Sequence, residues 1–523
     1  MSKTEKEPKL VDLCSSLMRV SHILERRADL TPHRIGCVLW ESRRRFHFQE
    51  LEERARKAAR LLLDLGVKKG DRVVLLAQNG IHYVDLFFGI AKIGAIFVPI
   101  NYRLAPPEIE YILSDCQPTI FFFSPLFEET IHSVRKRGVV PHWISLAGDG
   151  YEDALLTLSS NPLPFIYVDP ENPHSILYTS GTTGRPKGVM LSHRMILWNS
   201  INTIVSWGLR EDDIAPIFTP QFHSGGLNVL MVPLLYVGGR VIITELFRPP
   251  EALSLLEQER PTILFLVPTM FQTLSEDPAF RTTDFSSLRL LISGGAPCPE
   301  KLMEVYRRRG LIFRQGYGLT EVGVNCFTMT NDESATHSGS VGHPIFHSLA
   351  RIVNEEGKEV RSGEVGELIL SGPHVSSGYW NNPQATAEAI KDGWFYTGDL
   401  AVEKEGCYYI VGRRKEMFIS GGENIYPAEI ETVLLSHPKI QDVAVIGIPD
   451  ESWGEVGVAI VVLRARERAE AAEIQEFCRG KIAKFKIPKS VVFEDSLPRN
   501  AYGKIQREEL RARMNIRFRT QTG

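Results

Sequence analysis

The pattern of hydrophobic and polar residues predicts alternating helices and strands along most of the chain. Residues 49–66 carry apolar side chains at helical spacing up to Gly66, so we expect an amphipathic helix there. A short apolar strand follows within 68–79, then a second helix at 82–93 and a second strand at 95–101. The same order recurs where EALSLLEQER precedes TILFLV, and the strand LRLLIS leads directly into GGAP. This alternation predicts a parallel α/β sheet, with ligands bound where strands run into glycine loops.

The pattern changes from about residue 338, where short alternating runs such as GELILS and YYIVG are separated by glycine-containing turns. Such runs predict antiparallel β structure. A compact mixture of strands and helices follows the charged segment that begins after Gly412. We therefore expect an α/β protein in three parts: a large N-terminal domain of αβ sheets with a β-barrel-like subdomain (1–412), a hinge (413–416), and a small α+β C-terminal domain (417–523).

Composition indicates an ordinary globular protein of three or four structural units. The 523 residues are 43% hydrophobic and 24% charged, with a net charge of −3. A balance so close to neutral gives no reason to expect a nucleic-acid partner or an anionic membrane surface.

Seven scattered cysteines without a CxxC pair argue against a zinc site or a disulfide framework, and favour a reducing compartment. The N-terminus does not resemble a signal peptide, and no apolar run is long enough to span a membrane. We expect a cytoplasmic protein, with peripheral membrane contact left open.

The loop YTSGTTGRPKG at residues 178–188 is the first candidate for chemistry. Its glycines allow a ligand to approach the backbone closely, its hydroxyls can donate hydrogen bonds, and Lys187 adds a positive charge. Such a set can form a nest for phosphate oxygens, although loops of this composition are usually only turns. It is not a Walker A loop, because Pro186 stands where that motif has glycine.

The order of residues in this loop resembles the phosphate-binding signature of the adenylate-forming superfamily, which includes acyl-CoA synthetases, the adenylation domains of peptide synthetases and beetle luciferases. The resemblance implies that the loop binds the phosphates of ATP. The nucleotide-binding residues that it assigns here are Thr179, Ser180, Gly181, Thr182, Thr183, Gly184 and Lys187.

Further motifs of this superfamily follow in the expected order. TPQFHSGG at 219–226 resembles the segment beside the acyl pocket, and SGGAP at 293–297 resembles the loop on the adenine side. By themselves, a histidine after an aromatic residue and a glycine turn would be unremarkable. The resemblance assigns acid binding to Phe222, His223, Ser224, Gly225 and Gly226, a catalytic role to His223, and nucleotide binding to Gly294, Gly295 and Ala296.

QGYGLTE at 315–321 is the most specific of these matches. The resemblance implies that Tyr317 stacks on adenine, that Thr320 contacts the α-phosphate and that Glu321 helps to hold Mg²⁺. An aromatic ring, a hydroxyl and a hard oxygen ligand suit a base, a phosphate and magnesium. The neighbouring nucleotide-binding residues of this segment are Gln315, Gly316 and Gly318.

The last motifs surround the hinge and the C-terminal tail. WFYTGDL resembles the segment in which an aspartate, here Asp399, binds the ribose hydroxyls. Arg413 matches the arginine on the ribose and phosphate side, and Lys415 matches the hinge residue. Gly421 and Gly422 belong to the loop that lines the passage for pantetheine. PRNAYGKI resembles the tail that carries the catalytic lysine, here Lys504, although Tyr502 stands where threonine is common.

The resemblance implies a two-step ligation. A carboxylic acid attacks ATP to give acyl-AMP and pyrophosphate, and the thiol of CoA then displaces AMP after the mobile C-terminal domain rotates. ATP, Mg²⁺ and CoA are the expected cofactor and co-substrates. The enzyme is expected to be free-standing, as a monomer or a homodimer.

The acid is predicted only by class. Amino-acid-activating relatives have an aspartate where this chain has His223, and the stretch FHSGGLNVLMVPLL has no cation for a second carboxylate. Small side chains at 224–226 suggest room for a long or flat substrate. We expect a medium- or long-chain fatty acid, with an aromatic acid of the cinnamate or benzoate type as the second choice. A luciferase-like monooxygenase and an inactive nucleotide-binding relative remain alternatives.

Overall fold

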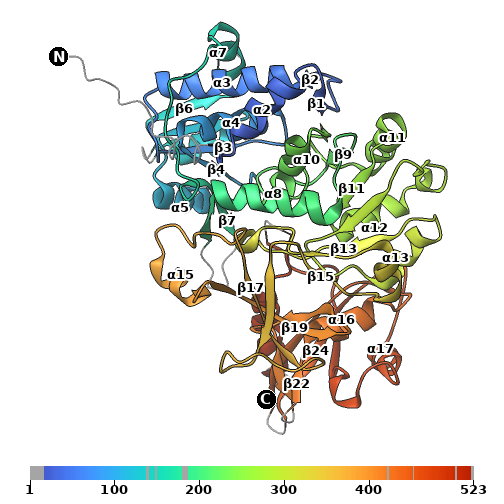
Figure 1. The fold of residues 1–523 in the computed structure, drawn as a ribbon. Helices are drawn as coiled ribbons and strands as arrows, with labels where there is room; N and C mark the ends of the chain where they lie inside the picture. Colours follow the sequence, from blue (N-terminus) through green and yellow to red (C-terminus); the bar gives the residue numbers. More distant parts are fainter. Residues whose placement is uncertain are drawn as a thin grey trace.

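The computed structural model describes residues 17–136, 140–147, 150–179, 186–420, 423–450, 453–500 and 503–519. The mixed α/β fold predicted from the sequence is confirmed, with a large N-terminal part and a smaller C-terminal part. Figure 1 shows the smaller part, coloured orange to red, below the helices and sheets of the first 300 residues or so.

A six-stranded sheet lies in the N-terminal part. Its order is β6–β5–β3–β4–β7–β8, and all neighbours are parallel except β7 and β8. The central strands are buried on both faces, which explains their uninterrupted apolar sequences. The bounds are β6 His142–Ser145, β5 Ile120–Phe123, β3 Arg72–Leu76, β4 Ile96–Pro99, β7 Pro173–Thr179 and β8 Lys187–Ser192.

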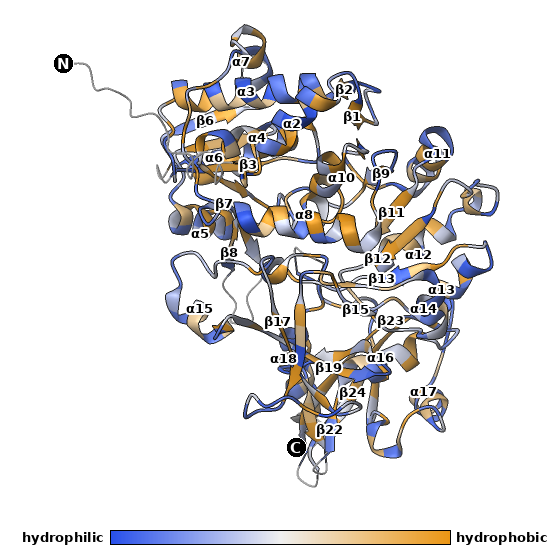
Figure 2. Ribbon diagram, in the orientation of Figure 1, coloured by the Kyte–Doolittle hydropathy of each residue, from blue (hydrophilic) through white to orange (hydrophobic). Residues whose placement is uncertain are grey.

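Two predicted helices pack on each other beside this sheet. Helix α3 (Phe48–Asp64) is amphipathic, and Figure 2 shows both hydrophilic and hydrophobic residues on it. Helix α4 (Ile81–Ile93) is buried almost all round, so its charged residues need partners. Asp85 pairs with Arg54 at 2.7 Å, and Lys92 pairs with Glu52 at 2.8 Å, in both cases across to α3.

Two smaller sheets carry the strands that lead into the glycine loops. One has the order β2–β1–β10–β9, and the other is the parallel set β11–β12–β13. The predicted helix EALSLLEQER is α11 (Pro249–Glu259), and TILFLV is β11. The bounds are β2 Arg45–His47, β1 Ile35–Leu39, β10 Arg240–Ile243, β9 Ile214–Ile217, β11 Ile263–Leu266, β12 Leu290–Ser293 and β13 Phe313–Gln315.

The region expected to be β-barrel-like is a five-stranded antiparallel sheet. Strands β16, β17 and β19 pair in that order, and β19 also pairs with β18 and β20. The bounds are β16 Leu349–Val353, β17 Val365–Ser371, β18 Ile390–Lys391, β19 Trp394–Lys404 and β20 Cys407–Arg413.

The C-terminal part has its own sheet, with helices on both faces. Helices α16 (Pro427–Leu435) and α17 (Ala471–Cys478) pack on one face, and α18 (Arg507–Arg519) packs on the other. Across the described ranges, no helix is both long enough and apolar enough to cross a membrane. The strands are β21 Phe418–Ser420, β22 Glu423–Ile425, β23 Ile440–Asp450, β24 Gly454–Leu463 and β25 Ser490–Phe493.

Candidate active site

A buried carboxylate joins three of the predicted site residues. Asp399, on β19, is 3% exposed. Its Oδ2 accepts a hydrogen bond from the Tyr317 hydroxyl at 2.6 Å, and its Oδ1 lies 2.9 Å from Arg413 Nε. Burial raises the pKa of Asp399, whereas Arg413 and the Tyr317 hydroxyl act in the opposite direction. The pairing places an arginine and an aromatic ring beside a carboxylate that can accept hydrogen bonds from sugar hydroxyls.

The loop after β13 is fixed by close backbone contacts. The Gly316 N–H donates to the Ser293 carbonyl at 2.7 Å, which ties this loop to the end of β12. A Cβ at Gly318 would lie 2.3 Å from the Val324 carbonyl oxygen, so only glycine fits there. Gln315 accepts a hydrogen bond from the Cys298 N–H at 3.3 Å and so links the two glycine loops.

Thr320 and Glu321 follow this loop in a single 3₁₀ turn (η3, Thr320–Val322). Thr320 is buried, whereas Glu321 is half-buried. The Glu321 Oε1 accepts a hydrogen bond from the Tyr379 hydroxyl at 3.1 Å. Tyr379 lies outside the predicted set, and its only sequence signal is a position just after a glycine.

Thr179 and Lys187 are partners at the facing ends of the antiparallel strands β7 and β8, so the described ends of the phosphate-loop signature lie side by side. The Lys187 ammonium lies 5.2 Å from the centre of the Tyr379 ring. The predicted residues that lie outside the described part of the chain are Ser180, Gly181, Thr182, Thr183, Gly184, Gly421 and Gly422.

His223 and Lys504 come from distant parts of the chain and influence each other. The Nδ1 of His223 accepts a hydrogen bond from the Gly225 N–H at 3.0 Å, so the neutral ring carries its proton on Nε2. Burial and, to a smaller extent, the positive charge of Lys504 together lower the pKa of His223 to about 4. Both residues are exposed to solvent.

The Lys504 N–H donates to Asn500 Oδ1 at 3.0 Å. Burial lowers the pKa of Lys504, and the positive charge of Arg413 adds to this effect, whereas Glu321 and Asp399 oppose it. Lys504 therefore lies within electrostatic range of these three predicted site residues. Lys415, between the two parts, is exposed to solvent. Even so, the protein packed around it partly removes water from its ammonium and lowers its pKa.

The expectation that residues 224–226 leave open space is wrong for Gly226. A Cβ there would lie 2.2 Å from the Pro220 carbonyl oxygen, so glycine is needed for a close backbone approach. Ser224 is also buried, and its hydroxyl accepts a hydrogen bond from Asn228 at 3.1 Å. Phe222 is buried too, with its ring edge-on to that of Tyr102 at 5.2 Å.

A phenylalanine that the sequence analysis missed lies between two of the glycine segments. A Cβ built on Gly294 would be 2.8 Å from Phe265 Cε2, and one on Gly225 would be 3.9 Å from Phe265 Cε1. The ring therefore packs against the backbone of Gly294 and faces Gly225 across a gap about one methyl group wide. The strand sequence TILFLV gave no signal for this role, because all its apolar residues look alike. Next to Gly294, Gly295 (φ +82°) and Ala296 are exposed.

The oxygen ligands at this site suit a magnesium ion that is held mainly by the phosphates of a nucleotide and only partly by protein. Within the described ranges no cluster of three or more His, Cys, Asp or Glu residues could form a metal cage by itself. Glu321 instead offers one carboxylate, whose Oε1 is already oriented by Tyr379. Mg²⁺ is commonly held by one or two carboxylates together with substrate phosphates and water.

Two family models match the chain. Residues 24–380 match the model described as AMP-binding enzyme, and residues 429–504 match AMP-binding enzyme C-terminal domain.

Similar proteins cover nearly the whole chain. A feruloyl-CoA synthase of Amycolatopsis sp. is 40% identical over 491 residues, or 93% of this chain and 97% of the relative. An indoleacetate–CoA ligase of Aromatoleum aromaticum is 38% identical over 506 residues, 94% and 98% of the two chains. A long-chain-fatty-acid–CoA ligase of Mycobacterium tuberculosis is 34% identical over 500 residues, which are 95% of this chain and 98% of the relative. The structure of o-succinylbenzoate coenzyme A synthetase from Bacillus subtilis with ATP and magnesium matches with a TM-score of 0.85 and 31% identity. The match covers 93% of this chain and 98% of the synthetase.

Proposed function

Because the chain belongs to the AMP-binding enzyme family and is an ATP-dependent CoA ligase, we propose that it activates an aromatic carboxylic acid. The enzyme uses ATP, Mg²⁺ and CoA. In the first step, a carboxylate oxygen forms a bond to the α-phosphorus of ATP, and the bond to pyrophosphate breaks. In the second, the CoA thiol loses its proton and attacks the acyl carbon, and AMP leaves.

The first step brings a carboxylate towards a polyanion, so positive charge is needed near the reacting atoms. We assign this role to Lys504, with Lys187 on the phosphate chain. Arg413 and Asp399 are assigned to the ribose, and Tyr317 to the adenine. Glu321 would hold Mg²⁺, which supplies further neutralisation of the phosphates when bound.

The second step needs space for the thiol where Lys504 lies during the first. We propose that the C-terminal domain (417–523) rotates on the hinge 413–416 relative to the N-terminal domain (1–412). Gly421 and Gly422 are then assigned to the pantetheine passage. His223 is accessible beside the proposed acid site, where a neutral ring with its proton on Nε2 can donate to an acyl oxygen.

The position of Phe265 carries the proposal of an aromatic acid. Phe265 is 8% exposed, and its ring lies against the backbone of Gly294 and faces Gly225 across a gap about one methyl group wide. A flat wall next to glycines favours a flat substrate, since aromatic pairs add about 0.5–1.5 kcal/mol beyond the area that they bury. The relatives named for ferulate and indoleacetate support the same class.

A fatty acid is the second candidate. The long-chain-fatty-acid–CoA ligase relative and the absence of Arg or Lys from FHSGGLNVLMVPLL favour it. The same absence weighs against a dicarboxylic acid. We further propose that the enzyme acts in the cytoplasm as a monomer or a homodimer.

The test is acid-dependent AMP release with ATP, Mg²⁺ and CoA, with the acyl-CoA identified by mass. The acids are acetate to palmitate, benzoate, 4-coumarate, ferulate, indoleacetate and malonate. We expect the highest kcat/KM with an aromatic acid. A maximum at medium or long straight chains would replace the aromatic substrate by a fatty acid, and an adenylate without thioester would refute CoA as the acceptor.

A further inference from the structure

Tyr379 contacts two charged groups that the proposed function places on the phosphates of ATP. Its hydroxyl donates to Glu321 Oε1 at 3.1 Å, and the Lys187 ammonium lies 5.2 Å from its ring centre. The side chain is half-buried. One side chain thus touches a carboxylate through its hydroxyl and an ammonium through its ring.

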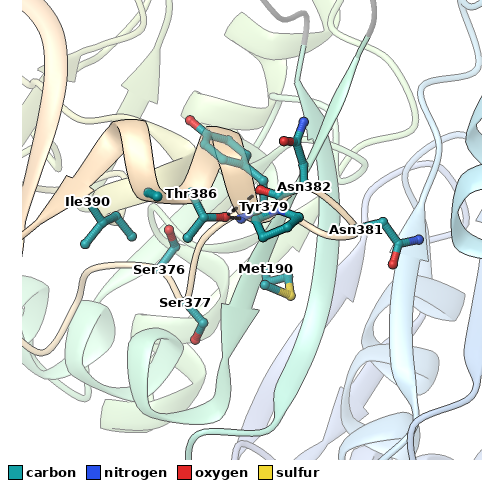
Figure 3. Close-up of a pocket in the computed structure, with 10 residues that line it drawn as sticks. Met190, Ser376, Ser377, Tyr379, Asn381, Asn382, Thr386 and Ile390 are labelled. Carbon is teal, nitrogen blue, oxygen red and sulfur yellow. Dashed lines mark hydrogen bonds between the residues drawn. The ribbon is translucent and has the colours of Figure 1, made fainter.

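The backbone around Tyr379 is fastened to strand β8, which begins with Lys187. Tyr379 forms an antiparallel bridge with Val189, and the Trp380 N–H donates to the Gly188 carbonyl at 2.7 Å. The Tyr379 N–H donates to the Thr386 hydroxyl at 3.0 Å, a bond that Figure 3 shows. The main chain that carries the ring is therefore held beside the start of strand β8, where Lys187 lies.

The same segment also holds the backbone of Glu321. The Ser376 N–H donates to the Glu321 carbonyl oxygen at 2.8 Å. Glu321 is thus held twice, at its main chain by Ser376 and at its carboxylate by Tyr379. Hydrogen bonds of this kind around a metal-binding carboxylate orient it and commonly change metal affinity 10- to 100-fold.

A purely structural role would call for a hydroxyl in the hydrophobic core. The Tyr379 ring does pack against the main hydrophobic core, but the residue is only half-buried and borders an open depression of about 650 Å³, which is also lined by Met190, Ser377 and Asn381 (Figure 3). Removing the hydroxyl therefore takes away a contact to Glu321 without opening a hole in the core.

We propose that Tyr379 is a positioning residue, which orients Glu321 for Mg²⁺ through its hydroxyl and Lys187 for the phosphates through its ring. The inference rests on the proposed function, because that function assigns Glu321 and Lys187 to the nucleotide. It separates two effects of one side chain: the hydroxyl governs the Mg²⁺-dependent part of nucleotide binding, and the ring governs the Mg²⁺-independent part.

The experiment measures binding of α,β-methylene-ATP by calorimetry, with Mg²⁺ and with EDTA, for the full chain and its variants. Tyr379→Phe removes the hydroxyl and keeps the ring, whereas Tyr379→Leu removes both. Tyr167 offers a matched control, because its hydroxyl donates to Asp169 Oδ2 at 3.3 Å and Lys69 lies 5.5 Å from its ring. Tyr167 lies before the first residue of β7, whereas Lys187 follows the last residue of that strand, so the control residue is at the opposite end of β7 from the proposed phosphate site.

Tyr379→Phe is expected to weaken binding about tenfold with Mg²⁺ and to leave binding in EDTA unchanged, as befits one hydrogen bond to a charged group. Tyr379→Leu is expected to weaken binding in EDTA as well, by about threefold, because an exposed cation–π contact is lost. The same changes at Tyr167 should alter neither value. Equal loss with and without Mg²⁺ in Tyr379→Phe, or no loss in either, would overturn the proposal.

A double-mutant cycle removes the remaining structural explanation. In a Glu321→Gln background, Tyr379→Phe should have no further effect on Mg²⁺-dependent binding, because the carboxylate that it orients is gone. An additive loss would show that Tyr379 does not act through Glu321 and would refute the role. Failure of the proposed function appears separately, as wild-type protein that binds the analogue but releases no AMP with any acid.

Discussion

Lys504 provides the sharpest test of how the two steps are divided. Its ammonium is influenced by Glu321 and Asp399 of the large part and by Arg413, the last residue of β20. We predict that Lys504→Ala blocks formation of the acyl-adenylate. Transfer from preformed acyl-adenylate to CoA should be largely unchanged, because in the proposed mechanism Lys504 has moved away by then.

The size of the effect follows from the surroundings of the side chain. Lys504 is accessible to solvent, yet the surrounding protein lowers its pKa, so the medium lies between water and a dry interior. With an effective dielectric constant of about 20 and a charge separation of about 5 Å, one unit charge contributes about 3 kcal/mol. Adenylation should therefore fall on the order of 100- to 300-fold.

The assay measures the two half-reactions separately. ATP–pyrophosphate exchange with the preferred acid reports adenylation, and acyl-CoA formation from synthetic acyl-adenylate reports transfer. Lys484→Ala is the matched control, because Lys484 is an exposed lysine of the same C-terminal part. An equal loss of both half-reactions in Lys504→Ala would refute the division of roles.

The pH dependence of adenylation gives a second readout from the same variants. Burial lowers the pKa of Lys504 from its ordinary value, and Arg413 adds to this effect. As pH rises through this lowered pKa, the ammonium loses its charge and adenylation should fall. The wild-type enzyme should therefore show an alkaline limb below the usual range of lysine, and Lys504→Ala should lack it. An identical limb in both proteins would contradict the assignment.

Three further changes test the substrate wall and the core. Phe265→Leu should lower kcat/KM for the preferred aromatic acid about tenfold relative to a straight-chain acid, because the contact between two rings is lost. If the ratio of the two kcat/KM values is unchanged in a panel of acids, Phe265 does not contact the substrate. Lys92→Met should reduce the free energy of unfolding in urea by about 2 kcal/mol, because the buried Glu52 loses one of its two cationic partners and keeps only Arg56 at 2.8 Å. His174 is fully buried with its pKa lowered to about 4, so the unfolded chain binds more protons between pH 6.5 and 4. Stability present above pH 6.5 should fall by about 2 kcal/mol by pH 5, and a His174→Asn variant should show a smaller decline in the same denaturation series.

The regular elements could be predicted where local pattern and tertiary environment agree. The helix expected at 49–66 is α3 at Phe48–Asp64, and the one at 82–93 is α4 at Ile81–Ile93. Helix α8 (His193–Trp207) was not predicted, because its buried side includes polar residues such as Asn199. The Asn199 Nδ2 donates to the Asn228 carbonyl at 2.8 Å, a contact between segments 29 residues apart that no local pattern reveals.

The site residues also fall into two groups, those that the sequence singles out and those that it does not. The pairing of Tyr317, Asp399 and Arg413 joins motifs that the sequence had already singled out, although it did not give their distances. Phe265 and Tyr379 were missed, because their roles depend on which segments lie opposite them. Sequence spacing alone cannot show that a strand phenylalanine faces two glycine loops, or that a tyrosine reaches a carboxylate 58 residues away.

The contacts on either side of Lys415 narrow the proposed hinge. Arg414 is tied to the large part, where its Nη1 lies 3.2 Å from Glu367 Oε2. Glu416, two residues later, is tied to the small part, where its carboxylate lies 3.1 Å from Arg507 Nε. A rotation within Lys415 can keep both ion pairs, whereas a rotation on either side must break one of them. Because Arg507 is largely buried, breaking its pair would be the more expensive change. In the proposed mechanism, the charges flanking the hinge therefore favour Lys415 as the residue about which the C-terminal domain would rotate.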